Sequence, residues 1–126
     1  MNTLIDTSVW VAHFKCYNDN LAYLIQSDFA LTHPMIILEL ACGTPPAPRQ
    51  QTLSDIALLR ACNQANSREV MDFIEREKLY GLGCGLVDMS LLTSTLLTPD
   101  TRLWTLDKRL ASLALRFGVL FMPPVH

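Results

Sequence analysis

The fold of this chain is decided by residues Thr3–Trp10, which read Thr-Leu-Ile-Asp-Thr-Ser-Val-Trp. The apolar pair at the start of this stretch suits a buried strand, and Asp6 stands where that strand would stop. An apolar helix is expected to begin directly afterwards, capped by Thr7 or Ser8. In open α/β sheets ligand sites lie at the carboxyl ends of the strands. Asp6 is therefore either a helix cap or part of such a site.

Short apolar strands and amphipathic helices alternate along the rest of the chain. Strands are predicted at 29–32, 103–106 and 119–121, and helices at 21–26, 34–42, 53–60, 67–79, after Gly85, and at 108–117. Residues 61–65 fit a short strand or a loop. In the helix at 34–42 we expect Met35, Leu38 and Ala41–Cys42 to be buried. The alternation predicts an α/β fold, with a parallel sheet wrapped by helices.

The composition indicates one folded domain spanning residues 1–126. Half of the residues are hydrophobic and the mean hydropathy is +0.23, which excludes a disordered chain and favours a partner or a dimer. The net charge of −2 and the pI of about 5.8 are not those of a basic nucleic-acid binder. We expect no DNA binding by this chain alone, and an RNA substrate would need a metal ion and a few local cations.

The cysteines and the N-terminus predict a cytoplasmic protein. Cys16, Cys42, Cys62 and Cys84 lack the spacing of a zinc site, so we interpret them as small buried residues in a reducing compartment. The N-terminus lacks the basic and apolar regions of a signal peptide. No apolar run approaches the about 20 residues of a membrane span, so no membrane association is expected.

Four acids recur in apolar surroundings: Asp6, Glu39, Asp88 and Asp107. Asp6 and Asp107 both follow a predicted strand and precede a helix, which would place them at the same edge of a parallel sheet. Two carboxylates about 4 Å apart repel by about 4 kcal/mol at an effective dielectric of about 20. A divalent cation would remove that cost, and oxygen-only ligands favour Mg²⁺ or Mn²⁺. Such sites support phosphoryl transfer by metal-activated water.

Each acid also has a purely structural explanation. Asp6 and Asp107 are suited to capping helices, and Asp88 lies in a first helical turn, where the helix dipole favours an acid. Glu39 lies between apolar neighbours, although a solvent-facing glutamate on a helix is common. The spacing alone leaves a metal site and four ordinary acids equally open.

Five further residues are candidates for supporting roles. Thr7, Ser8 and Thr105 could orient the carboxylates, although capping explains the first two equally well. Lys108 and Arg109 directly follow Asp107 and are the best candidates for contacting a substrate phosphate. The alternative for both cations is an ordinary exposed helix start.

Two other features receive structural interpretations. The turn Gly81–Gly85 lacks the length and the preceding strand of a dinucleotide-binding loop, so its glycines are expected to let the backbone pass close to a helix start. His13 and His33 stand beside no serine, cysteine or acid in a recognisable catalytic arrangement.

Four stretches together carry a family resemblance: Leu4–Trp10, Thr32–Gly43, Leu79–Asp88 and Leu103–Leu110. In this order and with these intervals, they resemble the four acidic motifs of PIN-domain ribonucleases, specifically the VapC toxins of type II toxin–antitoxin modules. The resemblance runs from about residue 2 to residue 118.

The resemblance implies a metal-dependent endoribonuclease built as a three-layer α/β/α sandwich around a central parallel sheet. Asp6, Asp88 and Asp107 would bind Mg²⁺ or Mn²⁺ directly or through water. Glu39 would complete the catalytic pocket through water or by orienting the nucleophile. The resemblance also implies a homodimer and a cognate antitoxin that blocks the pocket.

Two other functions are weighed against this one. A PIN-like module that binds RNA or a protein without cleaving it would share the fold. An acid-cluster phosphatase is disfavoured because Asp6-Thr7-Ser8 lacks the second nearby aspartate of a D-x-D pattern.

Overall fold

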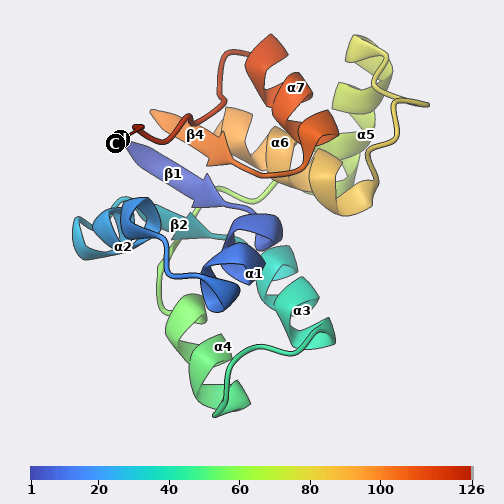
Figure 1. The fold of residues 1–126 in the computed structure, drawn as a ribbon. Helices are drawn as coiled ribbons and strands as arrows, with labels where there is room; N and C mark the ends of the chain where they lie inside the picture. Colours follow the sequence, from blue (N-terminus) through green and yellow to red (C-terminus); the bar gives the residue numbers. More distant parts are fainter. Residues whose placement is uncertain (126) are drawn as a thin grey trace.

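A computed structural model describes residues 1–125 of the chain (Figure 1). The elements follow one another in the predicted alternation: β1 (Asn2–Ile5), α1 (Thr7–Lys15), α2 (Asp19–Gln26), β2 (Ala30–Thr32), α3 (Pro34–Cys42), α4 (Arg49–Ala57), β3 (Arg60–Ala61), α5 (Ser67–Glu77), α6 (Leu86–Leu97), β4 (Thr101–Trp104) and α7 (Lys108–Arg116).

The four strands form one parallel sheet in the order β3-β2-β1-β4. From β1 the chain moves outward through β2 to β3, and it then returns to the other side of β1 to form β4. The strand order therefore reverses between β1 and β4, where Ile5 is paired with Trp104. Open α/β sheets bind ligands at the carboxyl ends of the strands at such a reversal.

The helices cover both faces of the sheet (Figure 1). Helices α1 to α4 lie on one face and α5 to α7 on the other, as right-handed crossovers in opposite directions require. The predicted three-layer α/β/α sandwich with a central parallel sheet is therefore confirmed.

The core contains buried leucines of β1, β4 and α6, and α6 packs against β4. Leu4 and Leu103 are completely buried in the sheet, as are Leu91 and Leu92 in α6. Burying one leucine side chain contributes about 1.5–3 kcal/mol. Two buried threonine hydroxyls of α6 are satisfied within the helix: Thr93 Oγ1 donates to Met89 O and Thr95 Oγ1 donates to Leu91 O, each at 2.7 Å. A helix enclosed in this way is a firm support for the residues at its N-terminus.

Strand β4 ends two residues before its predicted end at Leu106. The reason is that the Leu106 N–H donates to Ser8 Oγ at 3.0 Å, and the Asp107 N–H donates to Thr105 Oγ1 at 3.0 Å. Both backbone groups are thereby taken up by side chains, so the chain leaves the sheet after Trp104.

The weaker sequence patterns gave less accurate boundaries. The strand expected at 119–121 is reduced to a single bridge between Leu103 and Leu120. The helix expected to reach Arg60 ends at Ala57, and the ambiguous stretch after it contributes only Ala61 to the edge strand β3.

The cysteines differ in exposure. Cys62 is buried and Cys84 is half-buried, whereas Cys16 and Cys42 are exposed, so the prediction of burial is wrong for the last two. Among residues 1–125, no helix has both the length and the apolar character needed to cross a membrane.

Candidate metal centre at the edge between β1 and β4

Asp6 is the most deeply held of the four predicted acids. It is only 6% exposed and caps α1, which confirms the capping explanation of Asp6. Thr7 and Ser8, which were also considered as caps, are instead the first two residues of the helix. Its Oδ2 accepts hydrogen bonds from Ser8 Oγ at 2.6 Å and from Thr105 Oγ1 at 2.8 Å. Within residues 1–125, Oδ1 accepts no hydrogen bond. It is also not one of the buried side-chain atoms of these residues that lack a hydrogen-bond partner. This second oxygen is therefore open to solvent.

Asp107 caps α7 and is tied to the same network. Its Oδ1 accepts a hydrogen bond from the Leu110 N–H at 2.9 Å, and its own N–H donates to Thr105 Oγ1. Ser8 accepts from the Leu106 N–H in turn. Ser8 and Thr105, which were candidates for orienting the carboxylates, thus join the chain segments that follow β1 and β4.

Asp88 lies at the third position of α6 and is half-buried. Burial raises the pKa of its carboxyl above the ordinary value, and the nearby carboxylates of Asp6 and Asp107 raise that pKa further. A backbone hydrogen bond at Gly85 opposes the shift, and Glu39 adds to it. The charges of the other three predicted acids therefore all contribute to the raised pKa of Asp88.

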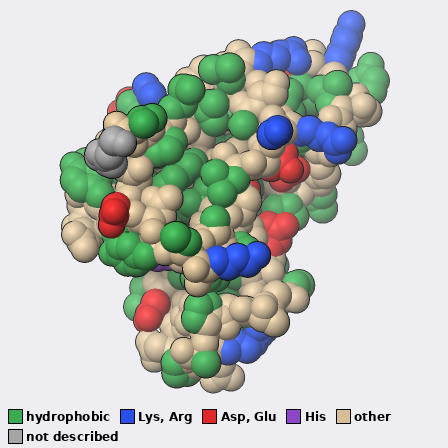
Figure 2. Space-filling view, viewed as in Figure 1, with side chains coloured by type: hydrophobic (Ala, Val, Ile, Leu, Met, Phe, Trp, Pro, Cys, Tyr) green, Lys and Arg blue, Asp and Glu red, His purple; other side chains and the backbone are tan. Residues whose placement is uncertain are grey.

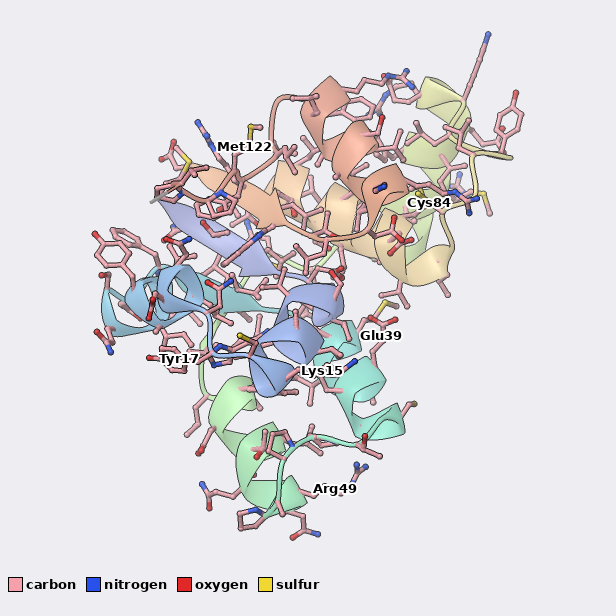
Figure 3. The ribbon with its side chains drawn as sticks, viewed as in Figure 1. Lys15, Tyr17, Glu39, Arg49, Cys84 and Met122 are labelled. Atoms are coloured by element: carbon pink, nitrogen blue, oxygen red, sulfur yellow. The ribbon has the colours of Figure 1, made fainter. Side chains whose placement is uncertain are left out.

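Glu39 completes the group from the rim. It lies on the exposed side of α3, and Thr7 Oγ1 donates a 2.6 Å hydrogen bond to its Oε1. Thr7 was also predicted to orient a carboxylate, and this contact holds Glu39 against the start of α1. In Figure 3, Glu39 and Cys84 lie on the side toward which β1 and β4 point.

The oxygen-only donor set fits Mg²⁺ or Mn²⁺ in its chemistry. Within residues 1–125, none of the four carboxylates takes part in a salt bridge, so their charges are not neutralised by protein cations. Across the same residues, no three His, Cys, Asp or Glu side chains stand close enough to form a ready ligand cage. Mg²⁺ commonly keeps several of its waters and binds through one or two carboxylates. The arrangement therefore fits an ion held partly through water.

Basic side chains flank the acids. Lys108 and Arg109 are the first two residues of α7, and both are exposed. Figure 2 shows acidic side chains gathered at the waist of the molecule with basic ones on either side. Lys15 was not singled out from the sequence; it lines a groove of about 590 Å³ together with Glu39. Figure 3 labels both side chains, Lys15 on α1 and Glu39 on α3. Only the packing of α1 on α3 brings Lys15 and Glu39 together, so no sequence pattern indicates that Lys15 lies beside the site.

Both histidines that were set aside have structural partners. His33 caps α3, with its Nδ1 accepting from the Met35 N–H at 3.0 Å. His13 Nδ1 accepts from the Asn18 N–H at 3.0 Å.

Comparison with known proteins gives the family. No family model matches the chain. Ribonuclease VapC32 of Mycobacterium tuberculosis, from strain CDC 1551 / Oshkosh and from strain ATCC 25618 / H37Rv, is 39% identical to it over 116 residues. The matched region covers 92% of this chain and 93% of the relative. The chain therefore belongs to the VapC family of PIN-domain ribonucleases.

Proposed function

We propose that this chain is a toxin endoribonuclease, which hydrolyses RNA phosphodiesters with Mg²⁺ or Mn²⁺ bound among Asp6, Asp88 and Asp107. One observation carries the proposal: at the reversal of the strand order, Thr105 Oγ1 joins the Asp6 carboxylate to the backbone of Asp107, and no protein cation forms a salt bridge with these acids within residues 1–125. The carboxylates of Asp6, Asp107 and Glu39 also raise the pKa of Asp88. Membership of a ribonuclease family supports RNA as the substrate.

Asp6 and Asp107 each use one carboxylate oxygen for the fold and would use the other for the metal ion. Ser8 and Thr105 fix the Asp6 carboxylate through Oδ2, which would leave Oδ1 available to hold a divalent ion. Asp107 uses Oδ1 to cap α7, and its other oxygen would be the one that holds the ion. A bound divalent ion would polarise the phosphodiester and lower the pKa of the attacking water.

The remaining charged residues act on the water and on the RNA. Glu39, held by Thr7, orients the attacking water from the rim of the pocket. Lys108 and Arg109 bind phosphate oxygens of the RNA strand, because they are exposed beside the acids and free to pair with an anion.

The test is an RNA-cleavage assay on the purified protein. Cleavage should require Mg²⁺ or Mn²⁺, stop in excess EDTA and return when Mg²⁺ is restored. Asp6→Asn should lower the rate by more than the about 100-fold that loss of an orienting partner costs at a metal site. Asp55→Asn is the matched control, because Asp55 is exposed on α4 and, within residues 1–125, its carboxylate accepts a hydrogen bond only from Gln51. Full activity in Asp6→Asn, or in EDTA, would refute the assignment.

A second candidate is a PIN-like module that binds RNA or a protein without cleaving it. The lack of a ready three-ligand cage among residues 1–125 is the observation that favours it. Tight RNA binding that ignores EDTA, without any cleavage, would decide for this alternative.

The proposal includes a cognate antitoxin, a homodimer and action in the cytoplasm. The groove beside Glu39 has apolar walls from Val11, Phe14 and Leu40, which suits a segment of another protein. Leu58 is 83% exposed, which suits contact with a further chain. Copurification with the product of a small adjacent reading frame would support the antitoxin, and light scattering would test the dimer.

A further inference from the structure

The side chain of Arg109, from α7, lies against the turn between α5 and α6. A Cβ placed on Gly83 would lie 2.8 Å from Arg109 Nη1, 2.9 Å from its Cδ and 3.0 Å from its Cζ. The same Nη1 lies 3.5 Å from the Gly83 carbonyl oxygen. The arginine thus lies across the backbone of Gly83 in the space where any other residue would have its side chain.

Arg109 is held beside the acids without being neutralised by them. It is exposed, lies two residues after Asp107 and makes no salt bridge within residues 1–125. Arg109 follows Asp107 at the start of α7, and the turn that contains Gly83 leads into α6, whose third residue is Asp88. One turn therefore has acids and a free cation around it.

The surface next to Arg109 is hollowed. A depression of about 320 Å³ is lined by Leu82, Lys108, Arg109, Ser112 and Leu113. It offers two cations, one hydroxyl and an apolar floor, which are the features needed to hold a sugar–phosphate unit against the protein.

An arginine that is already held in its binding position loses less rotamer freedom when it binds a phosphate. We propose that Gly83 is a positioning residue: by carrying no side chain, it lets Arg109 lie across the turn and hold an RNA phosphate next to the acidic pocket. The role of Gly83 rests on the proposed ribonuclease function. It adds to that function the residue that positions Arg109 for binding the RNA.

Two alanine variants separate this role from backbone strain. Gly83 and Gly81 both have positive φ, 85° and 72°, so alanine strains the backbone at either position. A Cβ on Gly81 meets no atom within 4 Å, whereas a Cβ on Gly83 meets the flexible end of Arg109. Gly83→Ala should therefore move the arginine aside, and Gly81→Ala is the matched control.

The measurement is the binding of a fluorescein-labelled single-stranded oligoribonucleotide to full-length protein in an Asp6→Asn background, over a range of salt concentrations. Gly83→Ala should weaken binding and reduce the slope of log K against log salt by about 0.7, the value for one phosphate contact to a single strand. Gly81→Ala should keep the slope. In the cleavage-competent protein, Gly83→Ala should raise KM far more than it lowers kcat.

A double variant decides the mechanism, and it remains informative if Gly83→Ala folds poorly. Arg109→Ala should lower the slope by the same amount, and adding Gly83→Ala to it should cause no further loss. The proposal is overturned if Arg109→Ala leaves the slope unchanged, if both glycine variants weaken binding equally, or if the Gly83→Ala loss persists without Arg109. Because binding is read in a protein that does not cleave, these results are independent of whether the wild-type chain cuts RNA.

Discussion

Asp6 has one oxygen for the fold and one for the proposed ion. Oδ2 takes hydrogen bonds from Ser8 and Thr105, whereas Oδ1 stays open to solvent. Asp107 shows the same division, because one of its oxygens caps α7. Helix capping and metal binding are therefore compatible at both residues, and choosing between them from the sequence was unnecessary.

Thr105→Val tests the orienting network at the residue scale. The valine removes the hydroxyl that donates to Asp6 and accepts from the Asp107 N–H, both of which are then left without this partner. The free energy of unfolding should fall by about 1–3 kcal/mol. Mn²⁺ affinity, measured by calorimetry, should fall by about 10- to 100-fold.

Thr95→Val is the control for this substitution. Thr95 is also buried, but its hydroxyl donates to the Leu91 carbonyl within α6, and no hydrogen bond within residues 1–125 joins it to the four acids. It should affect stability and leave Mn²⁺ affinity unchanged. An equal loss of affinity in the two variants would show that Thr105 has no special connection to the site.

At the scale of the elements, the ionised carboxylate of Asp88 near the N-terminus of α6 destabilises the folded protein. Burial and the neighbouring carboxylates raise the pKa of Asp88 above 3.8 in the folded protein, so the folded state binds this proton more tightly than the unfolded state. Ionised Asp88 therefore lowers the stability of the metal-free protein at neutral pH. This penalty is relieved as the pH falls through the raised pKa, and it is absent below 3.8.

Asp88→Asn should accordingly raise the melting temperature in EDTA at neutral pH, and the gain should vanish as the pH falls toward the ordinary carboxyl value. Thermal unfolding of both proteins across this pH range measures the difference. Asp72→Asn serves as the control, since Asp72 is exposed and, within residues 1–125, forms a salt bridge only with Arg68. A drop of several degrees at neutral pH would mean that Asp88 stabilises the fold.

The elements with strong local signals were predicted correctly. The helix of residues 108–117 has an amphipathic pattern and an aspartate cap, and it is observed as α7 with Asp107 at its cap. The strand expected at 103–106 was misplaced at its end, because the side chain of Ser8 takes up a backbone group from a segment 98 residues away. Such a contact leaves no trace in local sequence.

Helix α3 shows how uniform hydrophobicity misleads. Its apolar residues surround the helix, and the predicted buried face included Leu38 and Cys42, both of which are exposed. Ile36 and Leu40 are buried in their place. The error follows from the lack of a polar face to fix the rotation, so only the packing against α1 and α4 decides it. The same packing turns Glu39 toward Thr7 and hence toward the site.

At the scale of the whole molecule, the chain order within the sheet explains why residues so far apart in sequence meet. The reversal between β1 and β4 places the segments after both strands side by side, and α6, running back to β4, brings Asp88 to the same edge. The acids were identifiable from the sequence through four separate motifs. Lys15 and the contact of Gly83 with Arg109 were not, since both depend on how elements pack in three dimensions.

The most direct test is anomalous diffraction from crystals of the protein grown with Mn²⁺. A strong peak is predicted at the edge between β1 and β4, within direct or single-water reach of Asp6, Asp88 and Asp107. A map with no peak at this edge, in crystals whose carboxylates there are ordered and point away from one another, would contradict the proposal that these acids gather to hold a divalent ion.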